Sequence, residues 1–479
     1  MVATHAGLVR GSTFAGVTAF KGIPYAAAPT GALRWRPPEP ATPWRAVRDA
    51  TRFAPDCLGN FPDRSEMAED CLYLNLWTAG VGKRAKRPVM VWIYGGGYRG
   101  GSAAMPVLDG TSLAKQGVIL VSFGYRTGPL GFLATPELSA ESPRGVSGNY
   151  GILDAIAALQ WVRANIAAFG GDPGNVTVFG QSSGSETVNI LTASPLAKGL
   201  FQRAIGESGS SFGLRRALPL AAEEKVGVIF MQARKGKSLA ELRAMPVDQL
   251  IARNDEKLEP TIDGWLLPDD VHAIYAAGKQ NDVPMLIGNT AQEFPRPAEI
   301  TTAALHVDLV RQYGPLAGAI EAALAGDAPT DARWRLTNRE WGDFTAAIWS
   351  GLQAATGSAP AYRYLFDYAP PVPEGQLRIA RHGAEIPYVF GTYRHPGGLP
   401  MGAIDDRMHQ LISGYWVNFA RTGNPNGAGL PVWRPVGRVP ATVMRFSQSG
   451  AARAPARDAA LIGLLTRYHY KETSGREER

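Results

Sequence analysis

The fold is decided by the stretch Val176-Thr-Val-Phe-Gly-Gln-Ser-Ser-Gly-Ser185. Its first four residues are β-branched or aromatic, which is typical of a buried strand, and the pattern G-x-S-x-G follows directly over 180–184. A strand, this pattern and then a segment that can be helical form the context of a nucleophile elbow. Turning sharply from strand to helix strains the backbone at the serine, and side chains two residues away on either side would collide, so glycine is required there. The pattern predicts that the Ser182 hydroxyl is exposed at the carboxyl end of a sheet and at a helix N-terminus.

The five-residue pattern alone does not decide the chemistry. The chain contains 55 glycines, and a plain glycine-rich turn can produce the same pattern. The preceding strand favours the elbow, and the partners that a serine nucleophile needs must be found elsewhere in the chain.

Composition and charge restrict the class of protein. The chain has 479 residues, of which 45% are hydrophobic and 19% charged, as in ordinary soluble globular proteins. No apolar run approaches the roughly 20 residues of a membrane span. The first ten residues lack a charged region followed by an apolar one, so we expect a cytoplasmic protein, or a periplasmic or secreted one if a leader has been removed. The net charge of +7 is scattered, with short basic runs only at 83–87 and beyond Tyr470, which does not favour a nucleic-acid partner.

Predicted strands alternate with predicted helices. Between 151 and 169, apolar residues recur at helical spacing, which predicts one amphipathic helix packed on a sheet. The alternation indicates an α/β fold with a large, mostly parallel central sheet flanked by helices on both faces. Ligands of such sheets bind beyond the carboxyl ends of the strands. Besides the elbow strand, we expect strands at 88–94, 118–123, 203–206 and 284–288, and a hairpin over 7–20.

Two long segments, near 212–255 and 305–357, are helical in composition and lack strand signals. We interpret them as cap-like helical insertions that cover the active site and determine substrate specificity. No repeat or low-complexity linker divides the chain, so we expect a single domain over 1–479.

A serine hydroxyl becomes a nucleophile only when a base takes its proton and a third group orients that base. On a hydrolase sheet the order along the chain is serine, acid, histidine. His382 is the candidate base, because it lies on a loop beside a glycine and before an apolar segment that can anchor it. The other histidines lie near the termini (His5, His469), in polar helix-like stretches that we interpret as surface (His272, His306, His409) or in a Pro-Gly loop (His395).

The acid should follow a strand between the serine and the histidine. Glu293 fits, because it lies in the loop after the strand predicted at 284–288. Spacing alone does not separate it from three other carboxylates close by in sequence, Asp263, Asp282 and Glu299.

An oxyanion hole needs backbone N–H groups that no side chain covers. Gly95, Gly96 and Gly97 follow the strand predicted at 88–94, and the N–H of Ser183 lies directly after the nucleophile. A phosphate-binding loop is the alternative for such glycines, but no lysine follows in a G-K-[S/T] context.

Taken together, the ordered motifs of the chain strongly resemble the type-B carboxylesterases, the family that includes the cholinesterases and has a bacterial branch. The resemblance covers nearly the full length. Its motifs are Phe20-Lys-Gly-Ile-Pro-Tyr25, Glu69-Asp-Cys-Leu-Tyr-Leu-Asn75, Trp92-Ile-Tyr-Gly-Gly-Gly-Tyr98, Asn149-Tyr-Gly-Ile-Leu-Asp154, Phe169-Gly-Gly-Asp-Pro173, 180–184, the spacing from Gly288 to Glu293, His382-Gly-Ala-Glu-Ile-Pro-Tyr-Val-Phe-Gly391 and Trp416-Val-Asn-Phe-Ala-Arg-Thr-Gly-Asn-Pro-Asn426.

The resemblance implies an α/β-hydrolase fold and a serine esterase that needs no metal or cofactor. It makes Ser182 the nucleophile, His382 the base and Glu293 the acid that orients the base. By the same resemblance, the oxyanion hole consists of Gly96, Gly97 and Ser183.

The family pattern also implies supporting contacts. Arg34 and Glu69 resemble a structural ion pair of the family, and Ser208 resembles a second partner of the triad acid. The only two cysteines, Cys57 and Cys71, match the family's first disulfide, which we expect to be bridged in an oxidising compartment and reduced in a cytosol.

The chain also departs from the family pattern. Gln181 replaces the glutamate before the nucleophile, Ser183 replaces an alanine after it, and Phe294 replaces the glycine after the acid. The loop from 57 to 71 contains no tryptophan. Cholinesterases use that glutamate and a tryptophan of this loop to hold a quaternary ammonium, so we expect that this chain is not a choline-ester enzyme.

We therefore expect a carboxylic ester hydrolase that works through an acyl-enzyme on small-molecule esters, as a monomer or a small homo-oligomer. An amidase or a transacylase on the same triad is the main alternative, because the sequence does not determine the leaving group. A non-catalytic binding protein of the same fold is the other, although such proteins lose triad residues that this chain keeps.

Overall fold

The structure is a computed structural model that describes residues 1–60, 64–82, 85–235, 238–251, 257–394, 398–437 and 442–470. His395, part of the basic run at 83–87, part of the first predicted insertion and the tail after Tyr470 lie outside these residues. The statements below concern the described residues.

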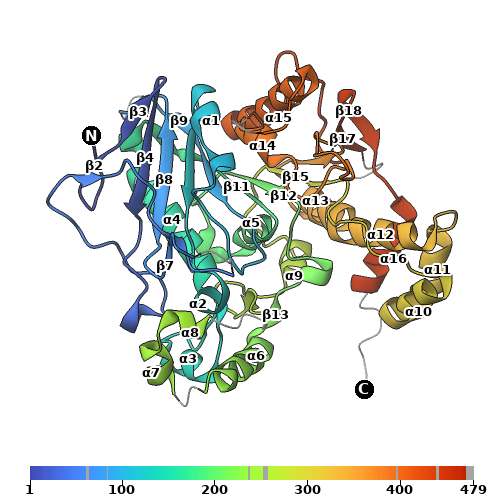
Figure 1. Ribbon diagram of the computed structural model, residues 1–479, viewed down its shortest axis with the longest axis horizontal. Coiled ribbons are helices and arrows are strands. Elements are labelled where there is room, and N and C mark those ends of the chain that lie inside the picture. The colour runs from blue at the N-terminus through green and yellow to red at the C-terminus, as the bar shows by residue number, and fades with distance from the viewer. Residues whose placement is uncertain are drawn as a thin grey trace.

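An 11-stranded sheet forms the centre of the molecule (Figure 1). From one edge to the other, its strands are β18 (Gly450–Pro455), β17 (Thr442–Ser447), β16 (Ala361–Phe366), β15 (Met285–Thr290), β12 (Arg203–Glu207), β11 (Gly171–Gln181), β9 (Arg87–Ile93), β10 (Ile119–Phe123), β8 (Tyr73–Thr78), β4 (Val17–Pro24) and β3 (Ser12–Phe14). Neighbours from β17 to β10 pair in parallel, and the remaining pairs at the two edges are antiparallel. The predicted mostly parallel sheet is therefore confirmed.

Three small sheets lie outside the central one. They are formed by β1 (Val2–Ala3), β2 (Leu8–Arg10) and β5 (Arg48–Asp49), by β6 (Asp56–Cys57) and β7 (Met67–Ala68), and by β13 (Leu218–Pro219) and β14 (Thr261–Ile262).

The central strands are buried on both faces, which explains their uninterrupted apolar sequences. In β9 the run from Val89 to Ile93 is fully enclosed, and Trp92 lies opposite Phe179 of β11 in the parallel register. The rings of these two residues are 4.8 Å apart between centroids, and Phe390 packs against Trp92 from a helix at 5.1 Å. Aromatic packing thus links the strand of the glycine turn to the strand of the elbow.

Helices cover both faces of the sheet. One face carries α4 (Tyr150–Asn165), α5 (Ser183–Ala193), α9 (Val271–Ala276) and α13 (Thr345–Thr356), and the other carries α1 (Thr111–Lys115), α14 (Ile386–Phe390) and α15 (Ala403–Thr422). Two neighbouring residues of β12 show the division, because successive strand residues face opposite sides. Gly206 lies against Trp349 of α13, whereas the Glu207 side chain accepts a hydrogen bond of 2.7 Å from Trp416 of α15.

The helix predicted over 151–169 is present as α4 and the 3-10 turn η3 (Ile166–Phe169). By length and composition alone, Tyr150–Phe169 is apolar enough to cross a membrane, which the sequence analysis did not anticipate. Of its most apolar window, 67% is buried inside the protein, and α4 packs on α2 (Gly128–Phe132), β11 and α5. This burial is that of a core helix.

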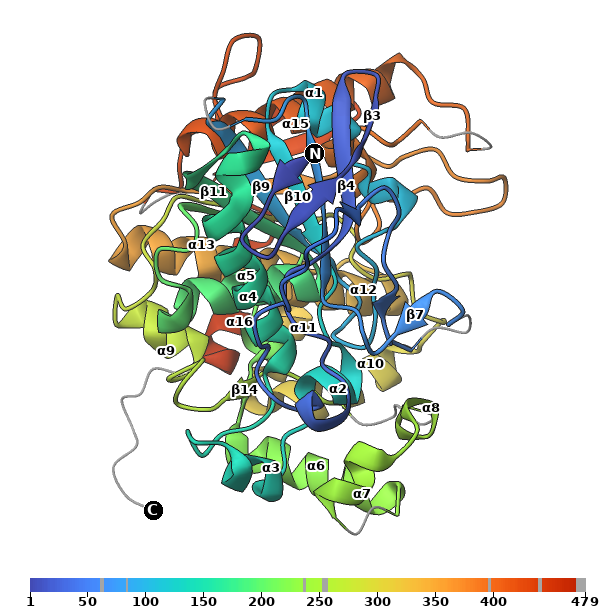
Figure 2. The same ribbon diagram turned by 90° about the vertical axis from the view of Figure 1, so that its left-hand side faces the viewer.

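The segment near 212–255 is helical in the structure, with α6 (Leu220–Ala233), α7 (Leu239–Ala244) and α8 (Val247–Leu250). These helices lie together with α3 (Pro136–Glu141) at the bottom of Figures 1 and 2. Ser139 of α3 donates a hydrogen bond of 2.6 Å to Glu224 of α6, and Gly227 lies so close to the Ala134 carbonyl that a Cβ would be 1.7 Å from its oxygen.

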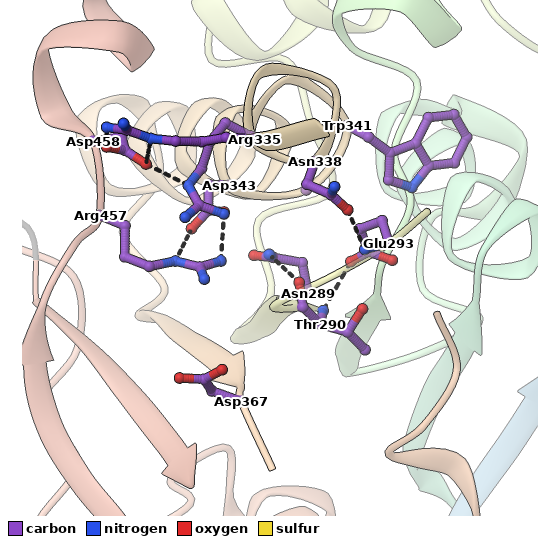
Figure 3. A network of polar contacts seen from close by, with 12 residues as sticks. Asn289, Thr290, Glu293, Arg335, Asn338, Trp341, Asp343, Asp367, Arg457 and Asp458 are labelled. Carbon is purple, nitrogen blue, oxygen red and sulfur yellow. Dashed lines mark hydrogen bonds and ion pairs between the residues drawn. The ribbon is translucent and has the colours of Figure 1, made fainter. Parts of the chain in front are cut away.

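The segment near 305–357 is also helical. It contains α10 (Thr302–Tyr313), α11 (Ala317–Ala323), α12 (Pro329–Asn338), the π-helical turn η7 (Arg339–Phe344) and α13. Together with α16 (Ala459–His469), it encloses a second apolar cluster that includes Leu309, Ile320 and Leu465. Two residues of this segment, Asn338 at the end of α12 and Trp341 in η7, lie next to Glu293 of the predicted triad (Figure 3).

Candidate active site

The parallel register brings the predicted site residues to one edge of the sheet. The glycine turn 95–97 follows β9, Ser182 follows β11, Ser208 follows β12 and Glu293 follows β15. These four strands are consecutive neighbours, and their carboxyl ends lie side by side because they are parallel. The loop after β16 carries His382, so five strand ends contribute to one site.

Ser182 occupies a strained turn between β11 and α5. Its backbone angles are φ 58° and ψ −129°, a combination that L-residues rarely adopt. The Ser182 N–H donates to the Glu207 carbonyl at 2.8 Å, and the Ser182 carbonyl accepts from the Glu186 N–H of α5 at 2.9 Å. A Cβ on Gly184 would be 2.0 Å from the Ile93 carbonyl oxygen, so the predicted need for glycine follows from the packing of the elbow on β9.

Glu293 is held by hydrogen bonds to Thr290 and to Asn338 (Figure 3). Its Oε1 accepts from the Thr290 N–H at 2.8 Å, and its own N–H donates to Asn338 Oδ1 at 2.5 Å. Asn338 also accepts from the Phe294 N–H, at 3.0 Å. The Glu293 side chain is 0% exposed, so its conformation is restricted on all sides.

His382 contacts Glu293 directly. Its Nδ1 lies 2.5 Å from Glu293 Oε2, and its ring is 31% exposed, whereas the carboxylate is fully enclosed. The Trp341 ring lies edge-on to the His382 ring, with 6.4 Å between centroids. This geometry fits a base whose orientation an acid maintains.

The pKa of His382 lies above its ordinary value. Burial opposes the charged imidazolium and lowers the pKa, but the hydrogen bond and charge of Glu293, with smaller contributions from Glu385 and Glu186, outweigh it. The ring therefore holds a proton more readily than a free histidine, which suits a group that must accept one.

The other carboxylates near Glu293 in sequence serve the fold. Asp263 accepts from Asn149 and from the N–H groups of 265–267, and Asp282 accepts from Ser358, Gln353 and the Ala359 N–H. Glu299 is an exposed carboxylate paired with Arg296. In the structure, Glu293 is the carboxylate of this region that contacts a histidine of the site.

The Ser182 hydroxyl makes no hydrogen bond to His382 among the described residues. Instead, His382 Nε2 lies 2.9 Å from Gln181 Nε2. Contacts between a nucleophile and its base are often long in the free enzyme and shorten when substrate binds. Gln181, the residue directly before Ser182, therefore touches the predicted base.

The predicted oxyanion residues lie beside the elbow. A Cβ on Gly95 would be 2.8 Å from Ser182 Cβ, so the 95–97 turn packs against the predicted nucleophile. Gly96 has φ 127°, and a Cβ there would be 2.0 Å from the Gly100 carbonyl oxygen. Within the described chain, the N–H groups of Gly96 and Gly97 donate to no protein acceptor, and Ser183 is the first residue of α5, whose N–H has no partner inside the helix.

Ser208 supports the acid through a shared donor. Its Oγ accepts from the Thr290 N–H at 3.2 Å, and the same N–H donates to Glu293. No described hydrogen bond joins Ser208 to Glu293 itself.

Two buried carboxyls near the triad were not anticipated as site residues. Glu207 precedes Ser208, and Glu385 lies three residues after His382 in a quoted motif. Burial raises the pKa of Glu207 to about 8, and burial together with the charge of Glu207 raises the pKa of Glu385 well above its ordinary range. Each has one side-chain oxygen without a hydrogen-bond partner among the described residues.

The predicted supporting contacts have clear geometry. Arg34 forms a bidentate pair with Glu69, at 2.5 and 2.7 Å, and its Nη1 donates to three carbonyls around the end of α7. Cys57 and Cys71 are joined in a disulfide.

The prediction for the remaining histidines is partly wrong. His306 is exposed, but His272 stacks on Tyr470 with 3.8 Å between ring centroids, and His409 Nδ1 donates to the Tyr388 carbonyl at 2.7 Å. Both are half-buried because their helices pack on the core. His469 pairs with Glu340 at 2.7 Å, far along the chain from the triad. No group of three or more potential metal ligands is found in the part of the chain that the structure describes.

Asn338, Trp341 and Thr290 are site residues that sequence reasoning missed. Asn338 and Trp341 come from the second helical segment, and nothing in their local sequence marks them. Thr290 acts through its backbone N–H, which carries no sequence signal.

Comparisons with known proteins identify the family of the chain. The family model described as "Carboxylesterase family" matches residues 1–311 and 344–460. A fumonisin B1 esterase of Sphingopyxis macrogoltabida is 38% identical over 465 residues, covering 90% of this chain and 83% of that protein. A para-nitrobenzyl esterase of Bacillus subtilis is 35% identical over 453 residues, covering 89% and 90% of the two chains.

Solved structures show the same likeness. A structure named PNB esterase superimposes with a TM-score of 0.84 at 32% identity, covering 97% of this chain and 99% of the other. A carboxylesterase of Geobacillus stearothermophilus gives a TM-score of 0.85 at 31% identity with the same coverage. The chain thus belongs to the carboxylesterase family and is a serine carboxylic ester hydrolase of the α/β-hydrolase fold.

Proposed function

We propose that ester hydrolysis proceeds on Ser182, His382 and Glu293 through an acyl-enzyme. The observation that carries this assignment is the 2.5 Å contact of His382 Nδ1 with the buried Glu293 carboxylate, beside a serine in a strained elbow at the neighbouring strand end. The contact leaves Nε2 of the ring as the nitrogen that can accept a proton.

In the first step, Ser182 Oγ attacks the ester carbonyl while His382 Nε2 takes the hydroxyl proton. The new Oγ–carbon bond gives a tetrahedral oxyanion, which the N–H groups of Gly96, Gly97 and Ser183 stabilise. The bond to the alcohol oxygen then breaks, and His382 returns the proton to that oxygen. In the second step, His382 takes a proton from water as the water oxygen adds to the acyl carbon. The bond to Ser182 Oγ then breaks, His382 returns the proton to Oγ, and the carboxylic acid leaves.

Glu293 stabilises the imidazolium that forms in both steps. Because Oε1 is already held by the Thr290 N–H, Oε2 is fixed toward Nδ1 and the ring keeps the tautomer that exposes Nε2.

A cavity beside the base offers room for the alcohol part of the ester. Its volume is about 1110 Å³, and Arg381, Gly383 and Ala384 on either side of His382 form part of its wall. Apolar side chains such as Val107 and Met401 also line it. We propose that the leaving group lies in this cavity, because its wall includes the chain neighbours of His382, the group that must protonate the leaving oxygen.

We infer that the second helical segment limits the acyl side of the site. Trp341 and Asn338 of this segment contact His382 and Glu293, whereas the first segment packs on α3. The cap-like role is thus proposed for 305–357, within one hydrolase domain.

Substrates are proposed to be small-molecule carboxylic esters, as the names of the relatives indicate. A protein that acts as an amidase or a transacylase would use the same residues, and an ester-to-amide comparison with matched acyl groups distinguishes them. Choline esters are not expected, because an amide occupies position 181. Size-exclusion chromatography with light scattering tests the expected monomer or small homo-oligomer.

The experiment that tests the assignment is hydrolysis of p-nitrophenyl acetate, butyrate and octanoate by wild type and Ser182→Ala. Loss of essentially all activity in the variant is expected. Equal activity in both proteins would refute the nucleophile. Val107→Trp should reduce turnover of esters with bulky alcohols and spare the acetate, if the cavity holds the leaving group.

A further inference from the structure

The side chain of Gln181 lies between the glycine turn and the loop of the base. It belongs to the last residue of β11 and is buried, at 6% exposure. A Cβ on Gly95 would be 3.0 Å from Gln181 Oε1, and a Cβ on Gly383 would be 3.5 Å from Gln181 Nε2. The amide therefore has glycines on two sides, and its Nε2 is 2.9 Å from His382 Nε2.

The nitrogen of His382 that carries the hydrogen determines whether Gln181 donates to Nε2 or accepts from it. Nδ1 of His382 faces the Glu293 carboxylate, which can only accept, so Nδ1 carries a hydrogen. In the neutral ring, Nε2 is then an acceptor, and the Gln181 amide donates to it. This lone pair is the same one that must take the proton of Ser182.

We propose that Gln181 is a positioning residue that occupies Nε2 of His382 in the free enzyme and competes with Ser182 for it. The inference rests on the proposed triad. It agrees with the absence of a hydrogen bond between Ser182 and His382 among the described residues, since one lone pair cannot serve both donors at full strength. Substrate entry must replace the amide by the serine hydroxyl.

An amide suits this place in a way that a carboxylate does not. By turning over, it presents Oε1 to the imidazolium and its NH2 group to the neutral ring, so it can pair with both protonation states. An ionised carboxylate pairs only with the imidazolium and would stabilise that form.

The charges around the ring strengthen this argument. Glu293 from the β15 loop, Glu385 before α14 and Glu186 of α5 all raise the pKa of His382, and Glu186 is paired with Arg215. A further carboxylate in contact with Nε2 would add to these and keep the base protonated to higher pH.

Two variants test the two halves of the proposal. Gln181→Leu removes the competitor without adding charge, so labelling of Ser182 in the free enzyme by phenylmethylsulfonyl fluoride at pH 8 should become faster, by roughly fivefold for one neutral hydrogen bond. Gln181→Glu should move the acidic limb of the kcat/KM profile for p-nitrophenyl acetate up by about one pH unit or more. At pH values above the shifted acidic limb, kcat/KM of Gln181→Glu should approach that of wild type.

Each outcome decides the matter. Slower labelling of Gln181→Leu would overturn the competition, and an unshifted acidic limb in Gln181→Glu would overturn the contact with Nε2. A merely structural role would change the rates without moving the limb. Ser182→Ala is included as the reference, because labelling that persists in it would mean that the triad assignment itself has failed. Thermal unfolding of each variant shows whether it is folded.

Discussion

Replacing Glu293 by glutamine should disable the base by imposing the wrong tautomer. Glu293 uses its two oxygens differently, since Oε1 accepts from the Thr290 N–H at 2.8 Å and Oε2 faces His382 Nδ1 at 2.5 Å. Glutamine has one oxygen. If its NH2 group faced the Thr290 N–H, two donors would meet, so the oxygen turns to Thr290 and the NH2 group turns to Nδ1.

The consequence is a hydrogen on the wrong ring nitrogen. Facing a donor, Nδ1 must accept, so the neutral ring carries its hydrogen on Nε2 and cannot take the proton of Ser182. Losses from this cause are on the order of 10⁴-fold in kcat in serine hydrolases, or about 5.4 kcal/mol at 1.36 kcal/mol per tenfold change. Removal of the carboxylate charge acts in the same direction, because that charge raises the pKa of His382.

The assay is steady-state hydrolysis of p-nitrophenyl acetate at pH 7.5 by wild type, Glu293→Gln and Glu299→Gln. Glu299 is a matched control, because it is a neighbouring glutamate on the exposed surface that pairs with Arg296 instead of a histidine. Its variant should keep full activity. A loss of less than tenfold in Glu293→Gln, with thermal unfolding unchanged, would refute the assigned role of Glu293 as the acid.

Three further predictions concern stability. Gly184→Ala places a Cβ 2.0 Å from a carbonyl oxygen of β9, so it should lower the unfolding temperature sharply or prevent folding, whereas Gly318→Ala, in an uncrowded helix position, should be neutral or stabilising by up to about 1 kcal/mol. Burial raises the pKa of Glu207 to about 8, so its contribution to the free energy of unfolding is complete below pH 4.5 and is lost as the pH rises through 8. Urea unfolding from pH 5 to 9 should show this decline in the free energy of unfolding. The decline should be smaller in Glu207→Gln. Reduction of the Cys57–Cys71 disulfide, which encloses a short loop, should cost up to about 3 kcal/mol, and an unfolding midpoint that does not respond to reductant would contradict this.

The parts of the fold that sequence predicted obey local rules. The elbow depends on contacts between residues four apart, since a Cβ on Gly180 would be 2.7 Å from Gly184. The G-x-S-x-G pattern has its two glycines at these positions, so the sequence alone indicates the crowding. The strand ends were predictable for a related reason. Apolar runs mark buried parallel strands, and parallel strands bring their carboxyl ends together.

The parts that sequence did not predict depend on distant packing. Asn338 reaches Glu293 across 45 positions of chain, and its place depends on how the helices of 305–357 fold around a separate apolar cluster. His409 looked like a surface residue because its neighbours are polar, yet α15 packs on the sheet and directs the ring to the Tyr388 carbonyl. The contact between Gln181 and His382 spans 201 positions of the chain. The sequence therefore shows that glutamine replaces glutamate at position 181, but not that the glutamine side chain reaches His382.

Burial simplifies the electrostatics of a site that is rich in carboxyl groups. Burial disfavours the charged forms of Glu207 and Glu385 and raises the pKa of both carboxyl groups. Glu186 is charge-compensated by Arg215 at 2.9 Å. Of the carboxyl groups near the base, Glu293 is therefore the one whose negative charge acts on the ring through a direct contact.

The resulting field is asymmetric across the imidazole, and this asymmetry suits acyl transfer. On the Nδ1 side, the carboxylate of Glu293 stabilises the positive charge that the ring gains when it takes a proton. On the Nε2 side, Gln181 is uncharged and lies beside the turn that would hold the oxyanion. A carboxylate at 181 would hold the proton on the base up to a higher pH, which slows attack by Ser182 below the shifted acidic limb. The neutral amide avoids this, and its cost is the competition for one lone pair in the free enzyme.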